Sequence, residues 1–280
     1  MKSDPGYFGP NSMMWKVNKE ITVLFGGARA LLMHAAHPLI AAGARQTSFY
    51  QRDPWKRLIR TLSLQNSVTF GTKAEADESA QRINKLHEVI NGEDNVTGGY
   101  YDALDNEQLL WVHACLQISS IYFYEKTVKK LTEDEKDKYH KENSKAAQMV
   151  LVDIKLMPKT HNELKEWVIK KSREKDYLVK TDVAVDVYDI IGGGPVPKHI
   201  KPIWPFIAFT AFNTLPVEFR DIYGIKTSNF KKLIVNFNLF LLKFTRPFLP
   251  PFFRLIAPAR WAKQRITRSP NLRFSDKANY

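Results

Sequence analysis

The chain has 280 residues and a formal net charge of +13, with 44% hydrophobic and 12% aromatic residues. Its one cysteine, Cys115, excludes an intramolecular disulfide framework and a cysteine-based zinc or iron–sulfur site. No apolar run reaches the length of a membrane-spanning helix, and the first residues lack the apolar stretch of a secretory signal. A reducing, cytoplasmic location is therefore expected.

The positive charge is concentrated in the last third of the chain. Residues 196–280 hold 15 Lys and Arg against 3 Asp and Glu, a net of +12, whereas residues 1–195 are nearly neutral. The basic part is also rich in Phe, Trp and Leu, which is typical of a membrane-surface element and not of a nucleic-acid interface. We expect residues 1–195 to form a core and residues 196–280 a helical extension packed on it within one domain. The aromatic side chains of this extension either complete the core or enter the surface of an anionic membrane.

Helix signals run through nearly the whole chain and predict an all-α fold. In chain order, capping residues mark helix starts at Asp53–Pro54, Thr72–Glu75, Asp105–Gln108, Thr132–Glu135 and Thr160–Glu163. The helix from Thr72 is expected to stop at Asn91-Gly92, and the helix from Asp105 near Leu131. Further helices are expected at 182–191, Lys201–Phe212, Asn229–Thr245 and Ala259–Ile266. Strand alternation competes only at Leu178–Val187.

Two histidines, His34 and His37, lie three residues apart on a predicted helix. This spacing suits a metal ion, but no Asp, Glu or Cys lies nearby on the same helix to complete a ligand set. Pro38 biases His37 away from helical geometry and kinks the helix. His37 therefore either lines a pocket or bonds a carbonyl that the kink sets free, and His34 is expected to be structural.

The helix that begins after Asp53 has two different faces. At 100° per residue, Arg57, Arg60 and Thr61 share one face with Leu64 and Val68, opposite a face that comprises Trp55, Leu58, Ile59 and Leu62. The pattern predicts a helix whose apolar face packs into the body of the protein. Its cationic face either lines a cavity that contains an anion or is solvated.

Several blocks of the sequence resemble one known family. They are GGARALLMHAAHP (26–38), DPWKRLIRT (53–61), FGTKAEA (70–76), RINKLH (82–87) and YDALDNEQLLWVHACL (101–116), with weaker similarity in LTEDEKDKYHKE (131–142) and MPKTHNEL (157–164). The family holds latex-clearing protein (rubber oxygenase) and the membrane-bound oxygenase of the mycophenolic acid pathway. The resemblance implies a helical bundle with a globin-like core around heme b. It also implies an oxygenase that uses O2 on an apolar, isoprenoid- or lipid-like substrate, for example by oxidative cleavage of a C=C bond.

The resemblance also implies roles for individual residues. His87 ends the block that resembles the family segment with the axial heme ligand; the alternative is a core histidine bonded to a carbonyl. Arg57, Arg60 and Thr61 match the distal wall of the heme pocket. Arg60 stands where rubber oxygenase has lysine, and arginine stays protonated and cannot ligate iron. The distal glutamate of rubber oxygenase has no counterpart, because an ungapped count reaches Ala41.

Three further residues are candidates for contact with the cofactor. Arg29 either bonds a heme propionate or forms a surface salt bridge. His113 either contacts the heme pocket from behind or only packs in an apolar helix, and His37 is the third candidate. Two other classes of protein stay open, a heme-binding carrier or sensor without turnover and a membrane-surface protein without a cofactor.

Overall fold

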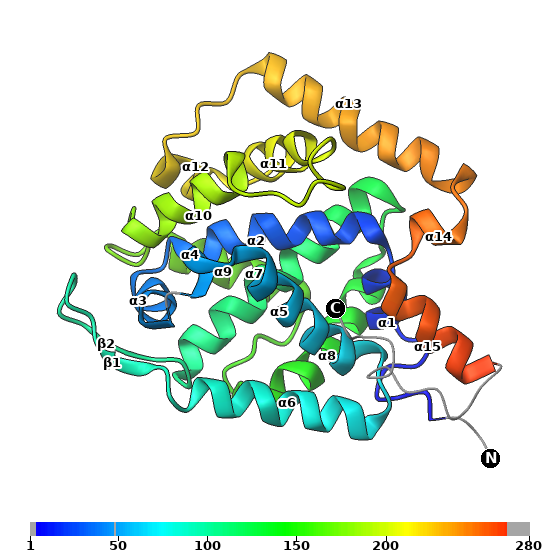
Figure 1. Cartoon of the computed structure of the whole chain (residues 1–280), viewed down its shortest axis with the longest axis horizontal. Coiled ribbons are helices and arrows are strands. Elements are labelled where there is room, and N and C mark those ends of the chain that lie inside the picture. Colours follow the sequence, from blue (N-terminus) through cyan, green and yellow to red (C-terminus); the bar gives the residue numbers. More distant parts are fainter. Residues whose placement is uncertain (1–3, 48, 268–280) are drawn as a thin grey trace.

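At the centre of the computed structural model, which describes residues 4–47 and 49–267, α2 (Phe25–Ala35) lies along α7 (Asn106–Thr127) (Figure 1). The two helices approach closely because α2 carries small residues. A Cβ atom at Gly26 would lie only 3.0 Å from the Ser119 carbonyl oxygen, so a larger residue there would force α2 and α7 slightly apart. Buried side chains of both helices, Leu32 and Trp111 among them, begin the main hydrophobic core.

The remaining elements surround this central pair. They are α1 (Met13–Asn18), the 3-10 helix η1 (Ile21–Leu24), α3 (Pro38–Thr47), α4 (Phe49–Arg52), α5 (Pro54–Phe70), α6 (Lys73–His87), β1 (Asn91–Glu93), β2 (Tyr100–Asp102), α8 (Glu133–Met149), α9 (His161–Ser172), α10 (Asp182–Gly193), α11 (Trp204–Asn213), α12 (Val217–Tyr223), α13 (Asn229–Thr245), the 3-10 helix η2 (Arg246–Phe248), α14 (Pro251–Arg254) and α15 (Ala257–Thr267).

The all-α prediction is confirmed, and the local signals for helix starts are confirmed with it. Thr72 and Thr132 each form a full capping box with the glutamate three residues later. The Asp53 carboxylate accepts from the Lys56 backbone N–H, with Pro54 in the first turn. The hydroxyl of Thr160 accepts from the Glu163 N–H and caps α9.

Three expectations about the elements are corrected. Leu178–Val187 contains no strand, since α10 begins at Asp182 with Thr181 as its N-cap. The helix from Thr72 ends at His87, because the chain turns there into the antiparallel hairpin of β1 and β2, which the sequence did not predict. The helix from Asp105 ends at Thr127, several residues before Leu131.

Pro38 breaks the helix more completely than a kink would. The axes of the Ile21–Ala35 segment and of α3 differ by 103°. In the described part of the chain, no single helix has the length and apolar character needed to cross a membrane, and only this bent pair meets both criteria together.

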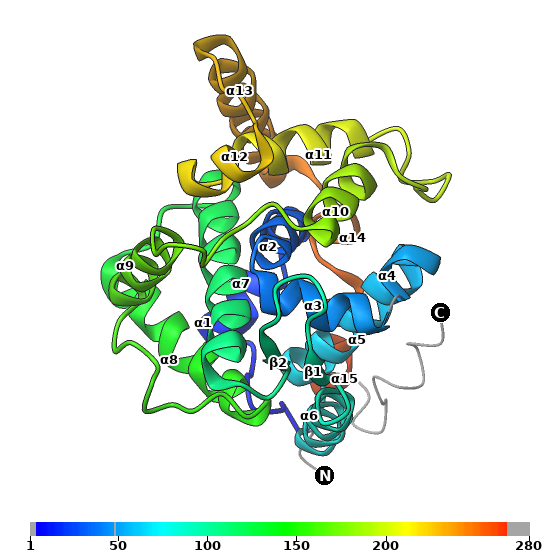
Figure 2. The same ribbon diagram turned by 90° about the vertical axis from the view of Figure 1, so that its left-hand side faces the viewer.

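Helices α11, α12 and α13 lie together on one side of the central pair (Figure 2). There, α11 packs on α2 and α10, and α13 packs on α7 and α11. The chain then returns to its beginning, where the Ile256 backbone N–H donates to the Lys19 carbonyl and Arg246 forms an ion pair with Glu20 at 2.7 Å. The division into a core and an extension at residue 195 stays a prediction, and residues 268–280 of the extension lie outside the described residues.

Candidate functional site

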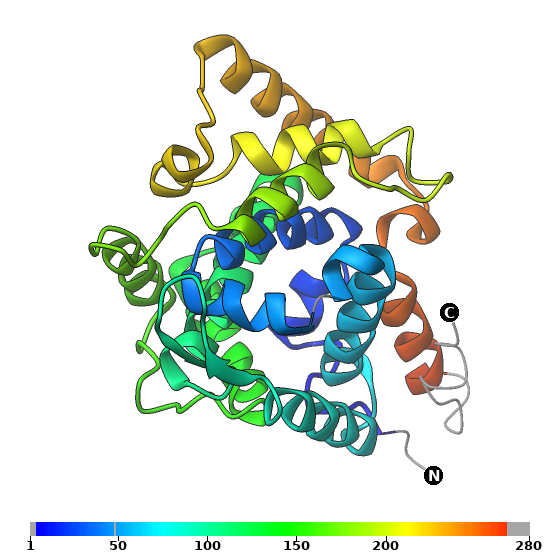
Figure 3. The ribbon, with the colours of Figure 1, turned by 60° about the vertical axis from the view of Figure 1, so that its left-hand side comes forward.

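The residues predicted for the distal wall of the heme pocket and the predicted axial ligand His87 lie on two consecutive helices that form a hairpin. Helices α5 and α6 are joined by Gly71 and Thr72 and pack against each other. Gly71 allows this tight turn, because a Cβ atom there would lie 2.4 Å from the Ser67 carbonyl oxygen. Figure 3 shows α5 and α6 diverging from this turn, with α3 between their far ends. Arg57 near the beginning of α5 and His87 at the end of α6 therefore both lie away from the turn, on helices that pack against each other.

His87 is a half-buried residue at the last position of α6. Its Nδ1 is buried and has no hydrogen-bond partner among the described residues. Burial lowers the pKa of His87, so the ring is neutral at neutral pH. Nδ1 of His87 therefore does not bond a carbonyl, as the alternative interpretation of a core histidine would require. The neutral ring has the unprotonated nitrogen that an axial ligand needs.

The cationic face of α5 is accessible. Arg57 is half-buried, whereas Arg60 and Thr61 are exposed. The expectation of a cleanly packed apolar face opposite them is wrong at Ile59, whose side chain is 46% exposed. The physical reason is that α5 is buried only in its last turn, Ser67–Phe70, while its beginning is anchored by Trp55, whose indole N–H donates to the Pro195 carbonyl.

His37 lies at the break between α2 and α3 and is almost fully buried. Its ring packs edge-on to Tyr177 at 4.7 Å between centroids and lies 6.1 Å from the ring of Trp111. Neither His37 Nδ1 nor Trp111 Nε1 has a hydrogen-bond partner in the described structure. Burial lowers the pKa of His37 to about 4. His37 therefore lies in an aromatic cluster, and its Nδ1 bonds no carbonyl freed by the break.

His34 and His113 each bond a backbone carbonyl. His34 Nε2 lies 3.0 Å from the Val112 oxygen, and His113 Nε2 lies 3.1 Å from the Asn143 oxygen. Burial lowers the pKa of each ring to about 4, and the charge of Arg57 is near enough to lower that of His34 further. The two rings connect α2 to α7 and α7 to α8. No group of three His, Cys, Asp or Glu side chains in the described residues has a metal-binding arrangement.

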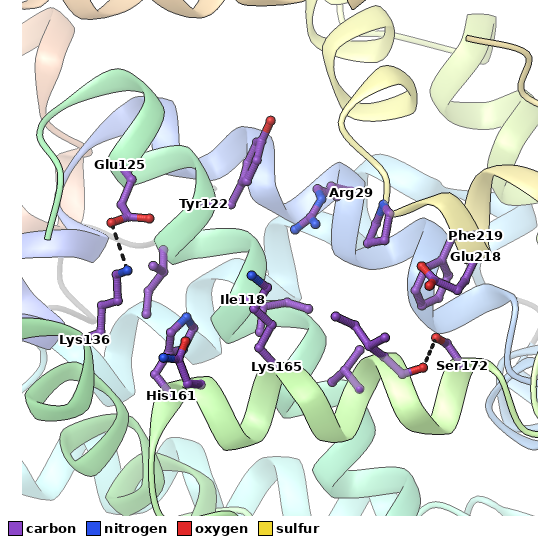
Figure 4. A pocket seen from close by; sticks show the side chains of 15 residues that line it. Arg29, Ile118, Tyr122, Glu125, Lys136, His161, Lys165, Ser172, Glu218 and Phe219 are labelled. Atoms are coloured by element: carbon purple, nitrogen blue, oxygen red, sulfur yellow. Dashed lines mark hydrogen bonds and ion pairs between the residues drawn. The ribbon is translucent and has the colours of Figure 1, made fainter. Parts of the chain in front are cut away.

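Arg29 faces a different part of the molecule. Its Nε donates to the Thr214 carbonyl at 3.0 Å and its Nη1 to the Ser119 hydroxyl at 2.8 Å, and its guanidinium lies 4.9 Å from the centre of the Tyr122 ring. None of these partners lies on α5 or α6. Arg29 instead lines a cavity of about 180 Å³ between α7, α9 and the start of α12 (Figure 4). The surface salt bridge predicted as the alternative for Arg29 is also not formed.

A comparison with known protein families matches residues 15–265 to the family described as ER-bound oxygenase mpaB/B'/Rubber oxygenase, catalytic domain. The chain belongs to this family. The match confirms the resemblance and extends it from about residue 170 to residue 265, so the chain is an oxygenase of the oxidoreductase class. Comparisons with curated proteins and with solved structures give no match.

The oxygenase contains one buried polar network that sequence reasoning missed. Gln117 on α7 lies within hydrogen-bond distance of His140 Nδ1 at 2.9 Å and of His161 Nδ1 at 3.2 Å, and it accepts from the Asn143 amide at 2.8 Å. The network joins α7, α8 and α9. His140 and His161 lie in the two weaker blocks of family resemblance, which was the available signal for them.

The residues of the α5–α6 hairpin fit the heme that the family resemblance implies. His87 offers a neutral imidazole with a buried, unpartnered nitrogen, and a rigid helix carries it. Arg57, Arg60 and Thr61 offer hydrogen-bond donors on the first half of α5, which packs against α6. Ala41, at the place of the family glutamate, is fully buried in α3 and supplies no carboxylate.

Proposed function

We propose that this oxygenase holds heme b with His87 as the axial protein ligand and uses O2 on an apolar, isoprenoid- or lipid-like substrate. The observation that carries the proposal is the buried, unpartnered imidazole nitrogen of His87 at the end of α6, a helix that packs against α5 with its donors Arg57, Arg60 and Thr61. Membership of the oxygenase family supports the reaction class. Heme, when bound, supplies the activation of O2, and oxidative cleavage of a C=C bond is the reaction we favour.

The protein's own groups then have distinct roles. His87 supplies a neutral nitrogen, because burial disfavours its protonation. Arg57 and Arg60 stay charged and Thr61 carries a hydroxyl, so all three donate hydrogen bonds toward a polar ligand or substrate oxygen. Arg60 has no lone pair for a metal ion, so the lysine-ligated resting state implied for rubber oxygenase is not expected here. His37 and the rings of Trp111 and Tyr177 keep water from the neighbouring α2–α3 break.

Oxygen consumption by the hemin-loaded protein tests this function. We expect uptake of O2 with squalene, which has C=C bonds, and none with its saturated counterpart squalane. Equal rates with the two hydrocarbons would contradict the proposed chemistry. A stable heme spectrum without O2 uptake on squalene or methyl oleate would favour a heme-binding carrier or sensor, the alternative that the absent lysine and glutamate keep open.

We also propose that the protein contacts an anionic membrane peripherally, from a cytoplasmic location. The support is an exposed row of large apolar side chains on α13, η2 and α14, here called the aromatic ridge: Phe230, Leu233, Phe237, Phe240, Phe244, Phe248, Phe252 and Phe253. Phe248 is 76% exposed, and neighbouring rings of the ridge contact one another, as Phe240 and Phe244 do at 5.9 Å between centroids. Monomeric proteins rarely expose a contiguous apolar surface of this size.

The ridge is separate from the packing face of α13. Val235 and Leu239 are buried against Phe123 of α7, whereas Phe237, Phe240 and Phe244 lie on the opposite side of the helix. Figures 1 and 2 show α13 along the outer edge of the molecule, away from α5 and α6. The aromatic residues nearer the start of the extension are less exposed. Trp204 and Phe212 are half-buried and pack on Trp55 and Tyr188.

The charge around the ridge favours an anionic lipid surface as its partner. The sequence from Ile222 to Ser275 contains eleven Lys and Arg and no Asp or Glu. Each Lys or Arg close to an anionic bilayer contributes about 1 kcal/mol, and aromatic rings enter the interface beside the headgroups. A ridge of aromatic side chains flanked only by cations therefore suits reversible insertion into such a surface.

Co-sedimentation with phosphatidylserine-containing vesicles tests the membrane contact. We expect the protein to bind them at low salt, to lose binding as salt is added, and to bind pure phosphatidylcholine weakly. The triple variant F237S/F240S/F244S should lose binding, whereas V89S/V96S/L156S, with three comparably exposed apolar residues elsewhere, should keep it. Failure of the unchanged protein to bind at low salt would end this proposal without affecting the heme proposal.

A further inference from the structure

The cavity beside Arg29 contains more positive charge than its own carboxylates neutralise. Glu125 and Glu218 are the acidic residues of its lining. Glu125 faces Lys136 at 3.4 Å and accepts from the Leu131 backbone N–H, and Glu218 forms an ion pair with Arg173 at 2.8 Å. Both carboxylates are therefore already occupied. In the described part of the chain, no carboxylate forms an ion pair with the two other cations of the lining, Arg29 and Lys165.

Arg29 is a buried charge with neutral partners only. Its side chain is 6% exposed, and its partners are a carbonyl, a hydroxyl and the Tyr122 ring. These contacts fix the guanidinium in place without cancelling its charge. Burial lowers the pKa of Arg29 only to about 10, so the group stays protonated at neutral pH. Buried charges in proteins are as a rule paired, and an unpaired one beside a cavity is a point where an anion is stabilised.

Lys165 brings a second positive charge to the same cavity from α9. Figure 4 shows its side chain and that of Arg29 directed toward each other from opposite walls. The exposed Lys165 and the buried Arg29 thus border the same cavity, and an anion bound there would meet both charges. The neighbouring His161 adds no third positive charge, because burial lowers its pKa to about 4 and keeps it neutral; its Nδ1 lies 3.2 Å from the Gln117 amide.

The rest of the lining is mostly apolar. Besides the polar Asn162 and Ser172, it consists of Ile118, Ile121, Val168, Ile169, Pro216 and Phe219. The cavity volume of about 180 Å³ is about six times the volume of one water molecule in the liquid. A short carbon chain or a small ring fits this space, whereas an inorganic anion would leave the apolar walls without a partner.

We propose that this cavity is a binding site for a small organic carboxylate with an apolar body. Arg29 and Lys165 hold the carboxylate from two sides, and the apolar side chains of α7, α9 and α12 hold the carbon chain. The site shares no residue with the α5–α6 hairpin, and the proposal does not rest on heme or on the oxygenase reaction.

Calorimetric titration of the full-length protein with hexanoate tests the site, with 1-hexanol as the uncharged match. We expect saturable binding of hexanoate and binding of 1-hexanol that is at least about tenfold weaker, because one charge-assisted contact is worth that factor or more. Equal affinity for the two probes, or no saturable binding of hexanoate, would overturn the proposal.

Two matched lysines on α9 make the test specific. Lys165 lines the cavity and Lys170, exposed on the same helix, does not. We expect Lys165→Gln to weaken hexanoate binding about tenfold and Lys170→Gln to leave it unchanged. Arg29→Gln should abolish binding, but Arg29 is buried and this variant could fail to fold, so the decision rests on the exposed Lys165. Unchanged affinity in Lys165→Gln would contradict the proposed site.

Discussion

The buried histidines of this protein differ in whether their ring nitrogens have hydrogen-bond partners. His34 and His113 bond carbonyls and His161 bonds an amide, which marks them as groups that hold helices together. His87 and His37 instead keep a buried nitrogen without a partner. Buried polar groups are normally satisfied, so the exceptions are the positions to examine for function. Of the two, only His87 lies on the helix that pairs with Arg57 and Thr61.

The first prediction concerns the donors on α5. If Arg57 and Thr61 face the bound heme, Arg57→Ala and Thr61→Ala should keep heme but change the affinity for carbon monoxide about tenfold, because each removes a hydrogen-bond donor. Arg82→Ala, on the exposed face of α6, is the control and should change nothing. Unchanged affinities in both α5 variants would place this face in solvent.

Arg60→Lys gives a complementary expectation at the same face. A lysine can lose its proton and ligate iron, whereas arginine cannot. The variant should therefore show an additional heme absorption species at alkaline pH that the parent protein lacks. An identical spectrum in parent and variant over the whole pH range would show that residue 60 does not reach the heme.

The roles proposed for His87 and for the α5 donors rest on sequence blocks that repeat a known pattern. The structure adds that these residues lie on two helices that pack against each other. Of the two alternatives predicted for Arg29, a heme propionate bond and a surface salt bridge, the salt bridge is not formed among the described residues. The burial of Arg29 depends on Ser119 and Thr214, which are 90 and 185 residues away in sequence. The Gln117 network was missed because no local pattern shows that three helices will bring His140 and His161 together.

At the scale of elements, helix starts were predictable and the hairpin of β1 and β2 was not. A capping box is a contact between residues three positions apart, so Thr72 and Glu75 reveal it directly. The hairpin depends on Asp94, which bonds Thr97 within the loop and Arg45 of α3 across 49 residues. Nor does the apolar pattern of α13 reveal which face packs, because both of its faces are apolar.

The second prediction concerns the contact that joins the two ends of the chain. Glu20 is 2% exposed and forms two hydrogen bonds with Arg246 at the end of α13. Arg246→Met would leave a buried carboxylate without its partner, so the free energy of unfolding in urea should fall by about 3 kcal/mol. The double variant E20M/R246M should recover part of this loss.

The matched control for that prediction is an exposed ion pair. Arg82 pairs with Glu78 at 2.6 Å on α6, and both side chains are largely exposed. Arg82→Met should lower the free energy of unfolding by less than about 1 kcal/mol, since solvent screens such a pair. Equal losses in Arg246→Met and Arg82→Met would refute the idea that the Glu20 contact anchors α13.

At the scale of the whole molecule, stability should fall in mild acid. The pKa values of His34, His37, His113 and His161 are each lowered to about 4, mainly by burial, against 6.5 for an ordinary histidine. Below pH 6.5 the unfolded chain binds protons at these four rings and the folded chain does not, so stability decreases as pH falls from 6.5 toward 4.

Urea denaturation without added hemin measures this effect. Between about pH 7 and about pH 5 we expect a loss of several kcal/mol, a range in which most carboxylates stay ionised in both states. His199, an exposed histidine, provides the reference, and His199→Gln should leave the slope unchanged. A free energy of unfolding that is constant over this range would contradict the neutral, buried state of the four rings.

The architecture as a whole separates the three proposed sites in space. The α5–α6 hairpin carries the proposed heme residues, the cavity beside Arg29 lies between α7, α9 and α12, and the aromatic ridge follows the outer edge of α13 (Figures 1 and 4). Because they share no side chain, each can be removed by substitution without removing the others.

Hemin titration of the unchanged protein and of His87→Ala, followed by the Soret absorption, tests the central claim most directly. We expect saturable one-to-one binding by the unchanged protein and by the control His199→Ala. His87→Ala should lose or greatly weaken the Soret band while its far-ultraviolet circular dichroism stays that of a folded helical protein. If His87→Ala keeps the spectrum and the stoichiometry of the unchanged protein, His87 is not the axial ligand and the account of the site is wrong.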